Sequence, residues 1–360
     1  MAGTNIVYSD SLYTKQLGEA MIGKIATPLK MIIEHESDAC TKKNGVQKTL
    51  FNIEKSNKFG ETIMGNTEFD VFKHAAEGAG AEGDNIQETN KKFIEHIQFM
   101  KEFVITQEML EDANYGIAAD AKRRAENFVR AYHKTMNKIC STALINATSA
   151  ELAADATNNP FKVKLDLTTA DDKPLFSASH VPAITGGKMT ALSNLFKPSA
   201  DVTDESDLGL YINMGANKIR NFQDEQGEPL EYVADTIILP GNMPKLEYMV
   251  KKICGSEREA GTANNDINVQ YGNWTIVVLP DWVATEEEFM LMSSEANKNL
   301  AGNMFFNRVP LNITPWVDNH TANHIWTGRC RFGVGFGSWK HIARFSLNAD
   351  STNGGSVITL

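Results

Sequence analysis

The chain has 360 residues, of which 42% are hydrophobic and 22% charged, and its 45 acidic and 35 basic side chains give a net charge of −10. These values exclude a wholly disordered chain and a coiled-coil rod, and the acidic balance argues against a sequence-reading nucleic-acid-binding protein, which is normally basic. No run of residues approaches the roughly 18 apolar positions of a membrane span. The N-terminus also lacks the pattern of a secretory signal.

The cysteines lie far apart and form no CxxC pair; they are Cys40, Cys140, Cys254 and Cys330. This spacing is typical of reduced thiols in a cytosolic protein, and not of a disulfide framework or a zinc site. Composition therefore predicts a soluble globular protein of the cell interior.

Residues 1–45 are predicted to form an arm. A short amphipathic helix is expected over residues 11–25, because Leu17, Met21 and Ile25 recur at helical spacing before a proline ends the pattern. The polar segment that follows is expected to be an extended connector.

Residues 46–105 are predicted to form strand, turn and strand, as an extended hairpin loop. VQKTLFNIEK and GETIMGNTEFDVF are rich in β-branched and aromatic residues. The return run KFIEHIQFMKEFVIT places Ile97, Phe99 and Phe103 on one face of a period-two pattern.

The Gly/Ala/Glu-rich stretch at about residues 74–90 has almost no apolar anchor, so it is expected to be a mobile tip. A long hairpin with little core is at best marginally stable alone. It must therefore lie on a support, for which another chain is a candidate.

The strongest periodic pattern runs from Ile117 to Ala143, where apolar residues recur at steps of three or four positions. This is the helical period, so a helix is predicted over residues 117–146. A single apolar stripe indicates that the helix lies across a sheet and is not buried on all sides.

Residues 150–200 are rich in loops with short strands, and from Thr203 the pattern is that of an α/β module. Thr203 is the expected cap of a helix. The inner face of this helix is predicted to be Leu208, Tyr211, Ile212, Gly215, Ile219 and Phe222.

The rest of the chain alternates between strands and one more helix. The strand DTIILP is followed by a helix over MPKLEYMVKKICG, with Asn242 as its expected cap, and by the strand NWTIVVLPDWV. Further strands are predicted over FMLM, MFFNRV and the final stretch NHIWTGRCRFGVGFGSWKHIARF.

The glycine-rich motifs do not fit a phosphate-binding loop. Gly333, Gly335 and Gly337 alternate along a predicted strand without GxGxxG spacing, so they are expected to allow close packing or a bulge. In GGKMT, residues 186–190, methionine stands where a phosphate loop needs serine or threonine.

The histidines are weak candidates for chemistry. His320 and His324 would lie roughly 13 Å apart on a strand, too far to share a metal ion, so structural or surface roles are favoured. His180 in LFSASH is the most tempting general base, but the sequence identifies no partner, which favours a packed loop residue. No serine or cysteine lies in a GxSxG elbow. The sequence therefore assigns no catalytic, cofactor-binding or metal-binding residue.

Acidic residues cluster between Asp201 and Asp235, where nine acids stand against two bases. A solvated face with good helix capping accounts for the cluster, and a surface that repels polyanions is the sharper alternative. No stretch interleaves basic and aromatic residues, so specific recognition of DNA or RNA is not expected.

The order of these parts resembles that of the major capsid protein of tailed bacteriophages, which has the Hong Kong 97-type fold. EGAGAEGDNIQE followed by FVITQEMLEDANYG is similar to the family's extended loop running into its spine helix, here KRRAENFVRAYHKTMNKICSTALINA. KPLFSASH with the later Ser193, Asn194 and Leu195 is similar to a segment of several phage head subunits. The resemblance covers nearly the whole chain in the order of its elements.

The resemblance implies an α+β chain with a Hong Kong 97-like major capsid fold. Its implied parts are an N-terminal arm (1–45), an extended β-hairpin loop (46–105, tip about 74–90), a peripheral domain (106–202 and 319–360) with a spine helix (117–146), and an axial α/β domain (203–318). The implied function is structural and not enzymatic: self-assembly into hexamers and pentamers of an icosahedral shell that encloses double-stranded DNA.

The resemblance also implies partners and a location. Besides further copies of the chain, the partners are a portal protein, a separate scaffolding protein and decoration proteins, while the DNA is contained and not bound by sequence, and no membrane is involved. The implied location is the virion, after assembly in the host cytoplasm. About 45 residues precede the loop, too few for the fused scaffolding domain of some relatives. Some relatives form an isopeptide cross-link through a loop lysine; Lys73, Lys91 and Lys92 are available, and nothing marks one as reactive.

Two other functions stay open. An encapsulin-like nanocompartment shares the fold and encloses enzymes, and genomic neighbours would distinguish it from a phage shell. A cytosolic hydrolase that uses His180 and a carboxylate would form a small soluble oligomer and lose activity on His180→Ala.

Overall fold

The computed structural model describes residues 36–37, 40, 45–66, 74, 77, 80, 83, 88–106, 108, 117–182, 184, 187–255, 268, 270–318, 320–321, 323–352 and 355–359. The predicted arm helix over residues 11–25 and most of the predicted tip lie outside these residues. No described helix has both the length and the apolar character needed to cross a membrane.

The chain divides into two compact units. The first unit comprises Met1–Gly45, His96–Asn137 and Asn307–Phe332, and the second comprises Val46–Glu95, Lys138–Phe306 and Gly333–Leu360. Three elements continue from one unit into the other: α4 (Ile117–Ile145), β11 (Asn303–Val317) and β12 (His324–Phe336).

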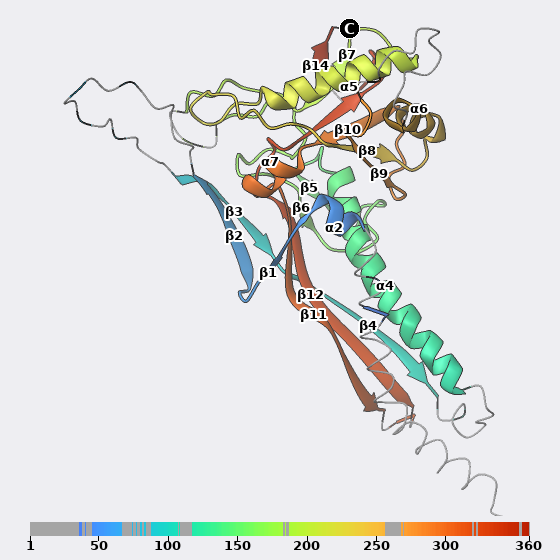
Figure 1. Ribbon diagram of the computed structural model, residues 1–360. Coiled ribbons are helices and arrows are strands. Elements are labelled where there is room, and N and C mark those ends of the chain that lie inside the picture. The colour runs from blue at the N-terminus through green and yellow to red at the C-terminus, as the bar shows by residue number, and fades with distance from the viewer. Residues whose placement is uncertain are drawn as a thin grey trace, which may run out of the picture. The chain divides into compact units, whose positions relative to one another are not determined.

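Within the first unit, β4 (Ile97–Ile105) pairs antiparallel with β12, from His324 opposite Ile105 to Phe332 opposite Ile97. The ring of Phe103 stacks on Trp326, with centroids 5.2 Å apart, and contacts Phe128 of α4 at 5.4 Å. The predicted helix over residues 117–146 is thus confirmed to within one residue, and so is its position across a sheet (Figure 1).

The core of the second unit is a six-stranded sheet in the order β14-β7-β13-β10-β8-β9. Its strands are β7 (Leu195–Pro198), β8 (Thr236–Pro240), β9 (Thr275–Leu279), β10 (Glu288–Met292), β13 (Ile342–Ser346) and β14 (Ser356–Ile358). β10 is antiparallel to both β13 and β8, whereas β8 and β9 are parallel. The strands predicted over DTIILP, NWTIVVLPDWV and FMLM are all confirmed.

Three helices accompany this sheet: α5 (Glu205–Arg220), α6 (Pro244–Gly255) and α7 (Ser294–Asn299). The predicted inner face of α5 is confirmed for five of its six residues, which are buried, and Tyr211 meets Phe289 and Phe345 edge to face. The sixth, Phe222, is also buried but lies beyond the end of the helix. Figure 1 shows α5 lying over this sheet, and the ring contacts of Tyr211 place the helix against β10 and β13.

Both predicted helix caps are wrong. The N-cap residue of α5 is Asp204 and not Thr203. The side chain of Asn242 binds the backbone of Ala284 instead of capping α6, accepting from its N–H at 3.1 Å and donating to its carbonyl at 2.8 Å. The amide of Asn242 binds this distant backbone because a short polar side chain can bind any backbone group that folding brings within reach.

The segment predicted as strand, turn and strand is more divided than expected. Val46–Leu50 is the helix α2 and not a strand, and β1 (Asn52–Lys55) joins the sheet β1-β11-β12-β4. β2 (Gly60–Asn66) and β3 (Glu88–Glu95) form the hairpin itself, as a separate two-stranded sheet.

The predicted return strand is also two strands, because the chain passes from β3 to β4 at the buried His96. Two further short strands, β5 (Glu151–Leu152) and β6 (Leu165–Asp166), pair in the loop-rich region that follows α4.

Candidate functional site

His180 is fully buried, and three side chains hold it. Its Nδ1 lies 2.7 Å from Oδ2 of Asp171, its Nε2 lies 3.2 Å from Oδ1 of Asn194, and its ring stacks on Trp339 with centroids 4.2 Å apart. Two backbone hydrogen bonds with Leu192 fix the loop that carries it. The interpretation of His180 as a packed loop residue is therefore confirmed.

The orientation of Asn194 determines which atoms donate. Its side-chain Nδ2 donates to the carbonyls of Leu175 and Ile342, at 2.6 and 3.3 Å. Its Oδ1 accepts from the N–H of Ser177 at 2.9 Å. An oxygen can only accept, so Nε2 of His180 must carry a proton toward Asn194.

Asp171 is the ionised partner of this histidine. Burial raises the pKa of its carboxyl, but hydrogen bonds from His180, the Thr169 hydroxyl and the N–H of Lys173 outweigh burial and hold the pKa below its ordinary value. Nδ1 of His180 therefore faces the Asp171 carboxylate and Nε2 faces the Asn194 amide oxygen, so both ring nitrogens already have buried partners. Neither ring nitrogen is open to a substrate, because the fully buried ring is enclosed by these partners and by Trp339.

Asp171→Asn is expected to lower the free energy of unfolding at pH 7 by about 2 kcal/mol, because it removes a charge-assisted hydrogen bond from a buried ring. The pKa of Asp171 is depressed in the fold, so its contribution is present above its ordinary value of 3.8 and is lost as the pH falls through the folded value. Urea unfolding at pH 7 and below pH 4 measures the difference in unfolding free energy between the parent chain and Asp171→Asn. This difference should be smaller in acid. Asp172→Asn, at the exposed neighbouring position, is the control and should change stability little at either pH.

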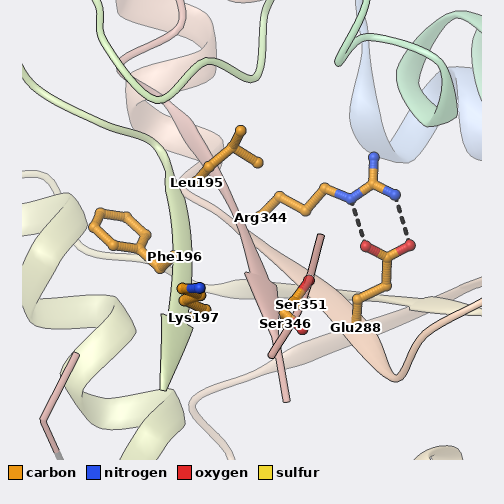
Figure 2. Close-up of a pocket in the computed structure, with 7 residues that line it drawn as sticks. All are labelled: Leu195, Phe196, Lys197, Glu288, Arg344, Ser346 and Ser351. Atoms are coloured by element: carbon orange, nitrogen blue, oxygen red, sulfur yellow. Dashed lines mark hydrogen bonds and ion pairs between the residues drawn. The ribbon is translucent and has the colours of Figure 1, made fainter. Parts of the chain in front are cut away.

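A small pocket lies beside a second buried pair, Arg344 of β13 and Glu288 of β10 (Figure 2). Its other lining residues are Leu195, Phe196, Lys197, Ser346 and Ser351. Its volume of about 10 Å³ holds roughly one water molecule, so it cannot admit a substrate.

The Arg344 guanidinium makes hydrogen bonds through all three of its nitrogens and also contacts two aromatic rings. Nε and Nη2 donate to the two oxygens of Glu288 at 2.8 and 2.6 Å, the fork drawn as dashed lines in Figure 2. Nη1 donates to the carbonyl of Ile145 at the end of α4, 3.2 Å away. The guanidinium also lies 5.3 Å from the ring of Trp282 and 5.9 Å from that of Phe176. This arginine therefore ties the sheet, the end of α4 and two loops together.

The histidines that the sequence paired as a metal motif have separate surroundings. His320 lies in a turn, where its backbone N–H donates to Asp318, and His324 begins β12. Among the residues that the structure describes, no three His, Cys, Asp or Glu side chains come close enough to hold a metal ion.

The alternating glycines allow close packing, as predicted. A Cβ at Gly335 would overlap Ile94 of β3, and one at Gly337 would overlap the carbonyl of Ala301. In the loop carrying the GGKMT motif, Met189 is buried and the N–H of Lys188 donates to the carbonyl of Glu225, so that group is not presented to a phosphate.

The three buried thiols, those of Cys140, Cys254 and Cys330, are inert in this fold. Burial raises the pKa of Cys254 and of Cys330 to about 11 and raises the pKa of Cys140 as well. A buried thiol with a raised pKa is protonated near neutral pH and is a poor nucleophile.

The loop lysines differ from one another. Lys92 is buried, and its ammonium donates to Asp166 and Thr168 at 2.5 Å each. Lys91 is exposed beside Glu88, and Lys73 lies outside the described residues. The ammonium of Lys92 is therefore already hydrogen-bonded within its own chain.

The β2–β3 hairpin has one packed face and one exposed apolar face. Ile94 packs against Met304 and Phe306 of β11, with Ile63 beside them. Met64 and Phe93 on the other face, by contrast, are each about half exposed. An exposed apolar group of this kind on a two-stranded sheet is typical of a protein contact surface.

Sequence reasoning missed most of these residues. It singled out His180 and Asn194, but not that they meet, and it did not identify Asp171, Glu288 or Arg344. Arg344 had one available signal, which is a charged residue inside an otherwise apolar strand, IARFS.

No protein-family model and no curated protein sequence matches this chain. Among solved structures, a chain in the capsid of the cyanophage P-SCSP1u matches with a TM-score of 0.50 and 11% identity, covering 84% of this chain and 88% of that one. A chain of Mycobacterium phage Patience (TM-score 0.49, 12% identity) matches over 95% of this chain and 90% of that one. The capsid of Myoviridae phage XM1 (TM-score 0.49, 11% identity) matches over 85% and 92%. The predicted α+β class is confirmed, and the chain has a fold similar to that of a phage capsid subunit.

Proposed function

We propose that this chain is the major head-shell protein of a tailed bacteriophage, which self-assembles into hexamers and pentamers of an icosahedral shell around double-stranded DNA. The observation that carries the proposal is the fold shared with a chain of the cyanophage P-SCSP1u capsid over 84% of this chain. The proposed location is the virion, after assembly in the host cytoplasm.

The proposed role is structural and not enzymatic. Its support is the state of the groups that chemistry would need. Both ring nitrogens of His180 are buried against partners, the pocket beside Arg344 has room for about one water, and the described buried thiols are protonated. These groups stabilise a fold and do not present a reactive atom.

The proposed division of labour follows the parts named from the sequence. Residues 46–105 act as the extended loop, residues 106–202 and 319–360 as the peripheral domain, and residues 203–318 as the axial domain around each capsomer centre. The support for the loop's role is the exposed apolar surface of the β2–β3 hairpin, which a neighbouring copy would cover. A portal protein, a separate scaffolding protein and decoration proteins are the proposed further partners.

The test is assembly of the purified chain, scored by negative-stain micrographs and light scattering. Shells or capsomer-sized rings are expected, and a strictly monomeric species across protein concentration and salt would contradict the proposal. Nuclease-resistant DNA inside shells made in cells distinguishes a phage head from a shell that encloses enzymes.

Met64→Ser with Phe93→Ser is expected to leave the chain folded but to reduce shell yield at least tenfold, because these two half-exposed side chains on one face of the hairpin would lose the burial that the proposed contact with another copy supplies. Shell yield is measured by sedimentation, and folding by circular dichroism. Lys91→Ser is the matched control, since Lys91 is directly opposite Met64 in the hairpin and contributes little apolar area. If Lys91→Ser reduced shell yield by as much, the exposed apolar side chains would not be the cause of the loss.

A further inference from the structure

The strand β4 lies at one end of the sheet β1-β11-β12-β4. Among the residues that the structure describes, no strand pairs with its second edge. Its first edge pairs with β12 in continuous register, from Ile97 opposite Phe332 to Ile105 opposite His324. A regular strand at the edge of a sheet presents a row of backbone N–H and C=O groups, which is a template for a further strand.

Two contacts show which residues of β4 point their backbone groups outward. The carbonyl of Phe99 lies 3.7 Å from Sγ of Cys330, its partner on β12, so this carbonyl points inward. The carbonyl of Val104 instead accepts from Nη1 of Arg124 in α4, at 3.0 Å. Backbone groups along an antiparallel strand point alternately to its two sides. The residues that direct them outward, before Val104, are therefore Gln98, Met100 and Glu102.

The side chains of these three residues share the face of the sheet that is turned away from α4. Phe103 contacts Phe128 of α4, with ring centroids 5.4 Å apart, so the odd-numbered residues of β4 are on the helix side. On the other face, Met100 is 59% exposed and its two neighbours are exposed as well. We call residues 98–102 the β4 edge.

The β4 edge carries charge but has no feature that blocks pairing. Native edge strands are protected by proline, by a bulge or by charges that a partner strand cannot satisfy. The β4 edge has no proline, and its two charges have opposite signs: Lys101 is on the helix side and Glu102 on the other face. On the face of Glu102, β12 contributes Arg329 and Arg331 and no acid. A partner strand therefore meets charges of both signs.

We propose that the β4 edge pairs antiparallel with the β4 edge of a second copy, about a two-fold axis that passes between their Met100 residues. This rests on the proposed function, in which capsomers must be joined to one another. The contacts within a ring are heterologous, whereas two rings related by a two-fold axis meet through a self-complementary contact. An antiparallel pair of identical strands has this symmetry.

One register of this pairing satisfies both the outward backbone groups and the charges. With Met100 opposite Met100 of the second copy, Gln98 lies opposite its Glu102, so an amide N–H can donate to a carboxylate. A shift of two residues in one direction puts Lys101 opposite Lys101 of the second copy. The opposite shift puts Glu102 against His96, which is buried where β3 passes into β4.

An extended segment of a different chain is the competing occupant, and the sequence of the β4 edge favours self-pairing. In the same register, Lys101 lies opposite Phe99 of the second copy, where an ammonium can contact an aromatic ring. Three outward pairs supply roughly six backbone hydrogen bonds. Such a contact is weak between two free chains and becomes strong only when many copies are joined at once.

Cysteine cross-linking of the assembled full-length chain tests the register. Met100→Cys is expected to give a disulfide-linked dimer, because Cα atoms in a hydrogen-bonded antiparallel pair are roughly 5.5 Å apart, which suits a disulfide. Gln98→Cys is the matched control on the same face. Its two copies would be roughly 14 Å apart, so at least tenfold less dimer is expected. Every variant also carries Cys40→Ser, since Cys40 is the native cysteine that is not buried.

The cross-linked fraction is measured on non-reducing gels after oxidation with copper–phenanthroline. Dimer from Gln98→Cys at the level of Met100→Cys would overturn the proposed register. Absence of dimer from Met100→Cys in assembled shells would overturn the pairing itself.

Met100→Pro tests the backbone contact. Proline removes an outward N–H that makes no hydrogen bond to β12, so the chain is expected to fold. Shell yield should fall at least tenfold while capsomer-sized rings remain. Met100→Ser keeps the N–H group and is the control, which should lose far fewer shells. Sedimentation and negative-stain micrographs measure shells and rings, and circular dichroism measures folding.

Shells from folded Met100→Pro at the parent yield would overturn the pairing. Loss of shells in Met100→Pro without a cross-link in Met100→Cys would also overturn it, because a different segment would then occupy the β4 edge. If Met100→Pro does not fold, the comparison of Met100→Cys with Gln98→Cys decides by itself.

The same samples separate this pairing from the proposed function. Parent shells without a cross-link in Met100→Cys would contradict the pairing and leave the proposed function intact. Specific dimers of Met100→Cys from a chain that forms neither rings nor shells would support the pairing and contradict the proposed function. A chain that gives neither dimers nor shells would contradict both.

Discussion

Arg344→Met is expected to lower the free energy of unfolding by about 3–5 kcal/mol, because it leaves the carboxylate of Glu288 buried without its counter-ion. The two side chains are 9% and 4% exposed and the adjoining pocket has room for only about one water, so bulk solvent cannot replace the lost fork. The same change removes the hydrogen bond to the carbonyl of Ile145 and the contacts with Trp282. Urea unfolding followed by tryptophan fluorescence measures the loss.

The double variant Arg344→Met with Glu288→Leu is the informative companion. Replacing both members of a buried ion pair by apolar residues is often neutral, so the double variant should recover most of the stability that the single variant loses. Arg344→Lys keeps the charge but not the planar fork and should fall between them. A double variant as unstable as Arg344→Met would show that the unpaired carboxylate is not the cause.

Acidification from pH 7 to pH 4 is expected to remove about 3 kcal/mol of stability through His341 alone. Burial lowers the pKa of His341 to about 3, against an ordinary value of 6.5. Below pH 6.5 His341 is therefore protonated in the unfolded chain but stays neutral in the folded chain, so the free energy of unfolding falls as the pH falls. The neutral ring is held by the hydrogen bond from its Nε2 to Oδ1 of Asn303, at 2.9 Å.

His341→Gln should flatten this part of the pH profile, since glutamine offers an N–H to Asn303 but does not titrate. His320→Gln is the control, because His320 is exposed and should leave the slope between pH 6.5 and pH 4 unchanged. Equilibrium unfolding at half-unit pH steps distinguishes them. A slope that persists in His341→Gln would assign the acid sensitivity to other groups.

Local sequence patterns predicted those helices and strands in which the spacing of apolar residues matches the face that is buried in the structure. The helix over residues 117–145 and the inner face of α5 were predictable because apolar residues at helical spacing have one face to bury. Val46–Leu50 was mistaken for a strand, because five residues with mixed propensity are decided by tertiary contacts. The carbonyl of Leu50 accepts from Asn297 and from Asn303, some 250 residues away in sequence.

The buried polar groups could not be predicted in the same way. His180 meets Asp171 and Asn194 from positions 9 and 14 residues away, with no spacing that marks them as a set. Arg344 and Glu288 are 56 residues apart and meet only because β13 pairs with β10. Such pairings depend on register across a sheet, which a single sequence does not encode locally.

The sequence by itself determined the α+β class, the long helix, most strands of the α/β module and the order of parts that resembles a phage capsid subunit. Only the tertiary structure decided that His180 is buried against Asp171 and Asn194 and that Arg344 ties β13 to β10. The physical reason is the distance along the sequence over which each interaction acts. Periodicity and capping act over a few residues, whereas desolvation, ion pairing and surface charge depend on which distant segments share a face.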